Sequence, residues 1–174
     1  MISAGIRRMI EDGSKASDIK AMDDFQLFNS LSSAGGFAAE MSSCIRSRKL
    51  FKRAVYVGLD SLDPSILRVS ERVIAQEIAA EAKVDPDYIL VDNPSLPDIA
   101  EGSFPTLLGG EVKLLREVSP LVSILERAHR ATWRMGVYAP ADLQEMVAYG
   151  ARRCLNLKKN TVQHTFSDID NSYL

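Results

Sequence analysis

The sequence predicts an α+β fold in which helices come first and a ferredoxin-like subdomain with the order β-α-β/β-α-β-α follows. Two observations predict this fold. Apolar residues recur at helical spacing through the first part of the chain, and runs of strand-forming residues alternate with amphipathic segments after Lys52. We therefore expect a helical segment over residues 1–50, the α+β subdomain over 51–156 and a flexible tail over 157–174.

The N-terminal segment is predicted to hold three helices. An apolar stripe over residues 2–10 predicts the first helix, which Gly13 can end as a C-cap. Asp23 is a candidate N-cap for the second helix, and the pair Gly35-Gly36 separates it from the third.

Four strands are predicted in the α+β subdomain, at residues 54–57, 88–91, 112–115 and 132–138. The segment 93–110 contains three prolines and ends on two glycines, so it is predicted to be a loop. This order implies two crossover units that place their helices on one face of a small sheet.

Three helices are expected between and after these strands. Asp63-Pro64 and Ser119-Pro120 each combine an N-cap residue with proline at the first helical position. The first of these helices continues through Ile78, and the last helix carries a buried stripe from Leu143 to Cys154.

Composition excludes several classes of protein. The 174 residues carry a net charge of −2 with 46% hydrophobic residues, which is typical of an ordinary soluble surface and not of a DNA-binding protein. Apolar runs are too short to cross a bilayer, so we expect no membrane contact and a cytoplasmic location. Cys44 and Cys154 are expected to be small core residues.

The residues of the chain predict neither a metal site nor a catalytic centre within it. Its two histidines, His129 and His164, are too few for most hydrolytic metal sites, and neither has a nucleophile at a meaningful spacing. Trp133 lies between Arg130 and Arg134 and could stack on a nucleobase, although packing of the indole in the core is favoured.

A basic cluster precedes the first strand and is the remaining candidate site. The stretch RSRKLFKRAVYV contains Arg46, Arg48, Lys49, Lys52 and Arg53. The pair Arg48 and Lys52, four residues apart, can grip a phosphate together. The alternative is a solvated helix end whose cations offset the carbonyl-rich C-terminus of the helix. In the following strand, Tyr56 is expected on the side of Lys52 and opposite Arg53.

Five segments, DDFQLFNSLSS, SRKLFKRAVYV, LVDNPSLP, EVSPLVSILERA and WRMGVYAPADLQEM, carry a family resemblance in their order. They resemble the region C-terminal to the catalytic core in HD-superfamily phosphohydrolases related to dNTP triphosphohydrolases. The resemblance implies a regulatory and oligomerisation region of a metal-dependent enzyme that acts on nucleotides. It also implies an upstream HD domain as partner and a homo-oligomer.

The metal motif of that family does not occur in this sequence, which contains no His-Asp dipeptide. We therefore expect a divalent metal only in the parent HD domain, and we expect this chain to be a fragment that is inactive alone. In nucleotide-regulated members of the family, the Arg and Lys of a similar motif contact an activating nucleotide at a subunit interface. The resemblance assigns this role to Arg48 and Lys52, with Leu50 and Phe51 as anchors into the core.

The alternative interpretation is a stand-alone ferredoxin-like module that binds a nucleotide or RNA. Such sheets stack bases on pairs of aromatic side chains. In the sequence Tyr56 and Tyr88 are isolated, so this interpretation is the weaker of the two.

Overall fold

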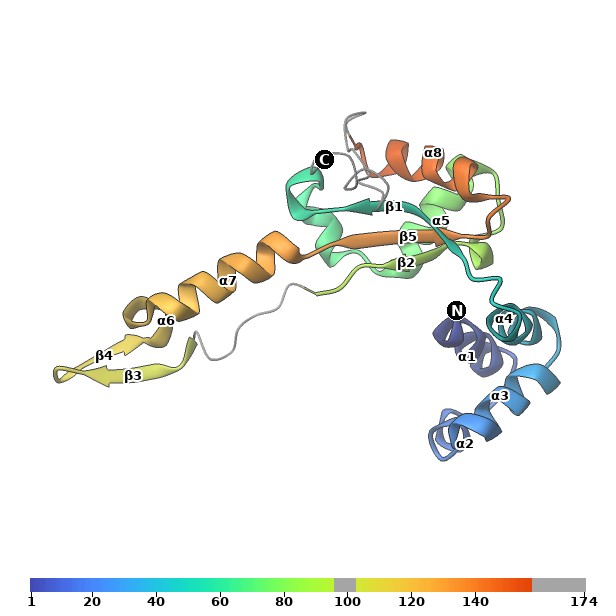
Figure 1. Ribbon diagram of the computed structural model, residues 1–174, viewed down its shortest axis with the longest axis horizontal. Helices are drawn as coiled ribbons and strands as arrows, with labels where there is room; N and C mark the ends of the chain where they lie inside the picture. The colour runs from blue at the N-terminus through green and yellow to red at the C-terminus, as the bar shows by residue number, and fades with distance from the viewer. Residues whose placement is uncertain (96–102, 158–174) are drawn as a thin grey trace, which may run out of the picture.

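The computed structural model describes residues 1–95 and 103–157 of the chain, and it confirms the α+β class with leading helices. The N-terminal helices form one group, and a three-stranded sheet with two helices forms a second (Figure 1). A hairpin and two consecutive helices project from the sheet as an arm. Two separate clusters of buried apolar residues correspond to the first two groups.

The first group contains the three predicted helices and one short helix that was not predicted. The capping box of Asp23 and Gln26 starts the third helix, with Gln26 N donating to Asp23 Oδ1 at 2.7 Å. Met9, Leu31 and Ala38 are the buried residues that hold the helices together. The helices are α1 (Ile2–Glu11), α2 (Ala16–Lys20), α3 (Asp24–Ser33) and α4 (Gly36–Arg46).

The sheet has the order β1-β5-β2, and its middle strand is the last one in the sequence. Strand β5 (Met135–Ala139) is antiparallel to both β1 (Lys52–Val57) and β2 (Leu90–Asp92). The two outer strands are therefore parallel to each other and are joined through a helix, so the sheet is a split β-α-β unit.

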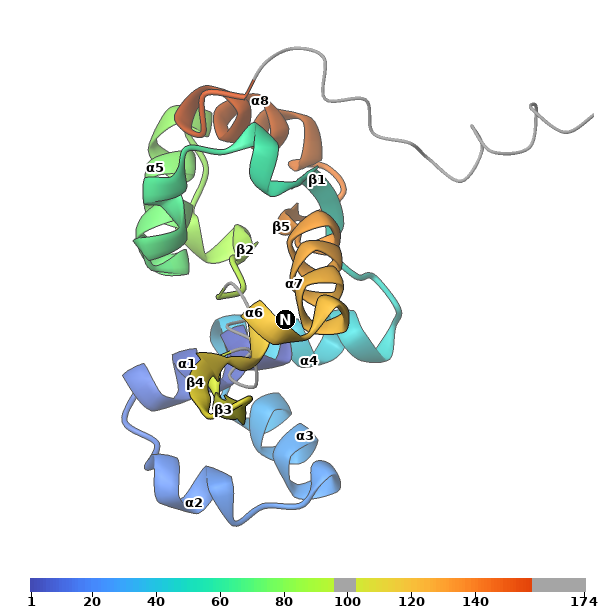
Figure 2. The ribbon, with the colours of Figure 1, turned by 90° about the vertical axis from the view of Figure 1, so that its left-hand side faces the viewer.

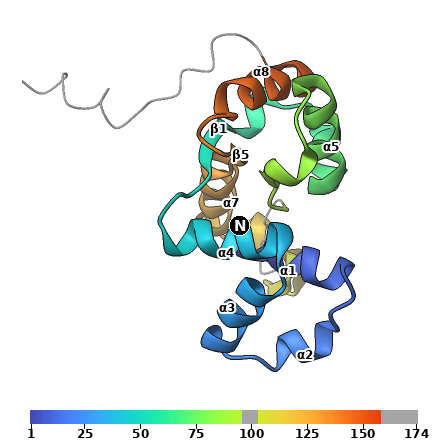
Figure 3. The same cartoon turned by 90° about the vertical axis from the view of Figure 1, so that its right-hand side faces the viewer.

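Helices α5 (Glu71–Ala82) and α8 (Gln144–Cys154) pack against each other and cover one face of the sheet (Figure 2). Their buried residues join those of the strands in the larger apolar cluster. The helices approach closely at Gly150, where a Cβ atom would lie 2.9 Å from Ala82 Cβ and 3.1 Å from the carbonyl oxygen of Ile78. The N-terminal helices lie below this subdomain, away from α8 (Figure 3).

The predicted start of the first crossover helix is wrong. Asp63 caps only a short 3-10 turn, Pro64–Arg68, by accepting a hydrogen bond from Ser65 N at 2.8 Å. The α-helix begins at Glu71. Its N-cap is Ser70, whose hydroxyl oxygen accepts a hydrogen bond from Val73 N. Two N-cap residues within one apolar segment thus divide it into a turn and a helix.

A second crossover unit in the same sheet was also predicted, and that prediction is wrong. The third predicted strand pairs instead with residues assigned to a loop, as the hairpin of β3 (Pro105–Leu108) and β4 (Glu111–Leu114). Gly109 and Gly110, at φ of 62° and 86°, allow the tight turn between them. Helices α6 (Leu115–Val118) and α7 (Pro120–Thr132) then complete the arm.

Trp133 lies where the arm joins the sheet, and its predicted place in the core is confirmed. Its side chain is buried, and Nε1 donates a hydrogen bond to the carbonyl oxygen of Pro94 at 2.8 Å. Because α7 continues to Thr132, β5 begins at Met135, later than the sequence predicts.

The close approach of α5 and α8 gives a test of the packing. Replacing Gly150 with Ala should destabilise the protein by about 1–3 kcal/mol, because the new methyl group meets the Ala82 Cβ and the Ile78 carbonyl. Helix propensity alone predicts the opposite sign, with Ala favoured by about 1 kcal/mol. Urea denaturation measures the difference, and Arg152→Ala on the exposed side of α8 is the control.

Candidate functional site

The basic cluster of residues 46–53 lies where α4 ends and β1 begins. The helix ends in a Schellman motif: Lys49 N donates to the carbonyl oxygen of Cys44 at 2.8 Å, and Arg48 N donates to that of Ile45 at 3.1 Å. This motif requires a left-handed residue at the position of Arg48, whose φ is 58°. Glycine is favoured in that conformation, so the chain carries an arginine where its backbone is strained.

All five cations of the cluster are exposed, and none forms an ion pair within the part of the chain that the structure describes. Arg48 directly follows Ser47, the C-cap of α4, and Lys52 is the first residue of β1. That Arg48 and Lys52 bind one phosphate group together remains a prediction.

The predicted alternation along β1 is wrong, because the strand contains a bulge. The register shifts between Arg53 and Val55, and both Ala54 and Val55 are buried. As a result Arg53 and Tyr56 share the open face of the sheet, with the guanidinium carbon 4.3 Å from the centre of the Tyr56 ring.

Leu50 and Phe51 were expected to be anchors in the core, but the structure does not place them there. Leu50 is 49% exposed and Phe51 is half-buried. Both line a cavity of about 750 Å³ between the N-terminal helices and the sheet subdomain. The segment between Arg48 and Lys52 therefore forms part of a pocket wall.

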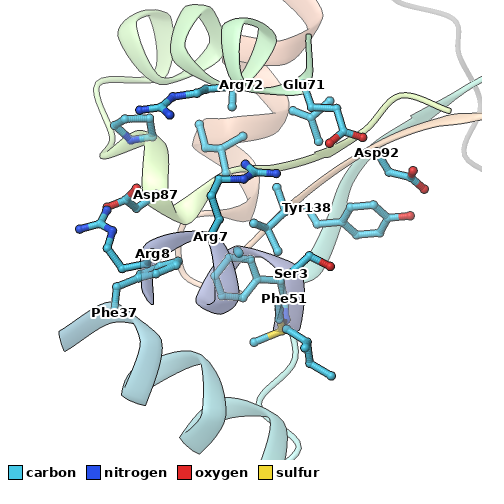
Figure 4. A pocket seen from close by; sticks show the side chains of 18 of the residues that line it. Ser3, Arg7, Arg8, Phe37, Phe51, Glu71, Arg72, Asp87, Asp92 and Tyr138 are labelled. Atoms are coloured by element: carbon cyan, nitrogen blue, oxygen red, sulfur yellow. Dashed lines mark hydrogen bonds and ion pairs between the residues drawn. The ribbon is translucent and has the colours of Figure 1, made fainter. Parts of the chain in front are cut away.

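The cavity has a wall from each of the two groups of elements. Helix α1 contributes Ser3 and Arg7, helix α5 contributes Glu71, and the sheet contributes Asp92 and Tyr138 (Figure 4). Aliphatic side chains cover most of the remaining wall. Its volume lies within the range of about 300–1,000 Å³ that is typical of small-molecule sites.

Polar contacts hold these two walls together at one end of the cavity. Arg8 of α1 pairs with Asp87, and Glu11 accepts a hydrogen bond from Arg72 of α5 at 2.9 Å. Tyr88 donates to Glu40 of α4 at 2.8 Å. We call these three pairs the polar clamp. The ring of Tyr88 also meets Phe37 edge-on, with the ring centres 5.8 Å apart.

Two tyrosines near the cavity have altered acidity. The pKa of Tyr88 is raised mainly by its hydrogen bond to Glu40, because ionisation of the Tyr88 hydroxyl would place two anions side by side. Burial raises the pKa of Tyr138, and the nearby guanidinium of Arg53 acts in the opposite direction. Both hydroxyl groups therefore remain protonated donors at neutral pH.

Sequence reasoning did not identify Tyr138 or Arg7. Alternation within β5 places Tyr138 on the face opposite the buried Met135 and Val137, but alternation alone does not indicate that this face borders a cavity. Arg7 has no local signal, since its position at the cavity depends on the packing of α1 below the sheet.

No group of three or more His, Cys, Asp or Glu residues that could hold a metal ion occurs within residues 1–95 and 103–157. The described residues thus do not fit the metal expected for the parent HD domain. His129 is exposed on α7, and His164 lies outside the described residues. In the same part of the chain, every helix is too short or too polar to cross a bilayer.

Comparison of the sequence with known proteins identifies its family. The family described as "HD associated region" matches residues 1–166. Comparisons with curated proteins and with solved structures each gave no match. The resemblance of the five quoted segments is thereby confirmed at the level of the region. Because the match spans nearly the whole sequence, this chain belongs to the family of HD associated regions, which accompany HD phosphohydrolase domains.

Proposed function

We propose that this chain is the regulatory and assembly region of an HD phosphohydrolase that acts on nucleotides, and that the basic cluster holds the phosphates of a regulatory nucleotide. Family membership supports the partnership with an HD domain. The parent domain would supply the divalent metal and the hydrolytic residues. The single observation that carries the regulatory role is the strained Arg48, exposed with four further cations at one junction.

Two features together favour an anion site over a solvated helix end: Arg48 is left-handed, as Lys83 also is at the end of α5, and Arg48 lies among four further exposed cations. A helix end needs no arginine in the left-handed region, and glycine would serve the Schellman motif with less strain. Residues held in such conformations are concentrated at functional sites. Because Lys83 shares this conformation, the attribution of the Arg48 guanidinium to a ligand rests on the strain combined with the neighbouring cations.

The arm supports a role in assembly. Seven large apolar side chains on it are between 43% and 72% exposed, namely Phe104, Leu107, Leu108, Val112, Leu121, Ile124 and Leu125. No described side chain of α7 is buried, and the elements of the arm pack chiefly against one another. Exposed apolar surface of this kind marks an interaction site. The proposed use is contact between subunits of a homo-oligomer.

Neutralising the proposed phosphate site should abolish most anion binding. The double substitution Arg48→Gln plus Lys52→Gln should weaken binding of inorganic tripolyphosphate by about tenfold or more, because two charge-assisted hydrogen bonds are lost. Isothermal titration calorimetry on the 174-residue chain measures this effect. The control replaces Lys15 and Lys83, two exposed lysines outside the cluster, with Gln. Equal affinity in both double variants would exclude the basic cluster as the site.

A single substitution at Arg48 distinguishes the effect of its backbone conformation on stability from the effect of its charge on binding. Arg48→Gly should raise the free energy of unfolding by up to about 1 kcal/mol, since it relieves the left-handed strain, while it weakens tripolyphosphate binding. Lys83, the C-cap of α5 at φ 55°, offers the matched control. Lys83→Gly should stabilise the protein similarly and leave binding unchanged. Loss of binding in both variants would indicate a nonspecific charge effect.

Charge placed on the arm should reduce self-association. Leu121 and Leu125 lie one helical turn apart on α7 and are exposed by 64% and 43%. Replacing both with Lys should shift the sedimenting species from oligomer to monomer in analytical ultracentrifugation. Val73→Lys, at a similarly exposed apolar residue of α5, is the control. Identical sedimentation of the arm variant and the unmodified chain would contradict assembly through the arm.

A further inference from the structure

The open face of the sheet, opposite α5 and α8, carries an ordered set of side chains. Residues that are directly opposite in neighbouring strands point to the same face, so Arg53, Tyr138 and Leu90 form one row across the sheet. Tyr56, Gly136 and Asp92 form the next row by the same register. Leu90, Asp92 and Tyr138 also line the cavity, which makes this face its floor.

The ring of Tyr138 lies over Gly136. A Cβ atom at position 136 would lie 2.6 Å from Cε2 of Tyr138 and 2.7 Å from its hydroxyl oxygen. Only glycine leaves room for the ring at this place in the sheet. The absence of a side chain at Gly136 thus lets an aromatic ring lie back across the middle strand at the cavity floor.

Charged groups surround this ring with a defined arrangement. Arg53 stacks on Tyr56 at one edge of the sheet, and Asp92 ends the row of Gly136 at the other. Arg53 pairs directly with Tyr138 across β1 and β5, and Asp92 is two residues along β2 from Leu90, the other partner of Tyr138. Burial raises the pKa of Tyr138, Arg53 lowers it and Asp92 raises it. Arg7 reaches into the cavity from α1 (Figure 4), and within the described residues it forms neither an ion pair nor a side-chain hydrogen bond.

We propose that this cavity binds a nucleoside monophosphate, with the base stacked on Tyr138, an exocyclic amino group of the base donating to Asp92, and the phosphate paired with Arg7. Aromatic side chains on an open sheet face stack bases, which every nucleobase permits. The carboxylate accepts hydrogen bonds only, so it favours bases with an amino group over uracil. This site does not use Arg48 or Lys52, since neither lines the cavity, although Arg53 of the basic cluster lies beside Tyr138 and both Leu50 and Phe51 line the cavity wall.

Titration calorimetry with AMP, GMP, CMP and UMP on the 174-residue chain tests the proposal. Saturable binding of the three amino-bearing nucleotides, each tighter than UMP, is expected. Tyr138→Leu should weaken AMP binding by about tenfold or more, which corresponds to the loss of one stacked base. Tyr138→Phe keeps the ring and should bind as the unmodified chain does.

Three further variants test each remaining part of the site. Gly136→Ala should weaken AMP binding as Tyr138→Leu does, because the methyl group displaces the ring. Arg7→Gln should weaken AMP but not adenosine, since only the nucleotide carries a phosphate. Asp92→Asn should reduce the preference for CMP over UMP. Circular dichroism and thermal melting confirm that each variant is folded.

The possible outcomes distinguish this site from the basic cluster. The Arg48→Gln plus Lys52→Gln variant should bind AMP normally, even if it loses tripolyphosphate. If that variant loses AMP while Tyr138→Leu keeps it, the nucleotide binds at the basic cluster and the cavity proposal is overturned. The absence of saturable binding of all four nucleotides overturns it as well, without affecting the proposal for the cluster.

Discussion

The polar clamp between the N-terminal helices and the sheet subdomain is the constraint on which the cavity depends. The two apolar clusters share no buried residue, so their relative position depends on contacts such as Arg8 with Asp87 and Tyr88 with Glu40. Polar contacts of this kind are partly exposed and contribute modestly to stability. They nevertheless fix the distance between α1 and the sheet, and therefore the cavity between them.

This form of connection differs from a continuous core. A continuous core would have filled the space below the sheet with apolar side chains, as α5 and α8 do on the other face. Instead the open face keeps Tyr138, Asp92 and Arg53 accessible at the cavity floor or its edge. Because a few polar pairs join the two surfaces, breaking these pairs would let α1 move relative to the sheet, and the proposed regulatory role would use such a movement.

Within residues 1–95 and 103–157, the candidate interaction sites lie at three places, each with a distinct physical character. The basic cluster is a solvated group of cations on a strained cap, the cavity is a half-enclosed pocket with an aromatic floor, and the arm is an exposed apolar surface. Anion recognition, base stacking and subunit contact draw on different forces, namely charge, dispersion and apolar burial. The proposed nucleotide binding and the proposed subunit contact would each use one or more of these forces.

The sequence by itself determined the α+β class, most of the helices with the Asp23 cap, and the position of Trp133 in the core, because these follow from local periodicity and from burial of a large side chain. It also placed Arg48 and Lys52 together at one junction, since they are close in the chain. Only the tertiary structure decided which strands share the three-stranded sheet. It showed that the third predicted strand lies outside this sheet, in the arm. The cavity unites Arg7 with Tyr138 across 131 positions, and no local pattern encodes a contact between surfaces that meet only after folding.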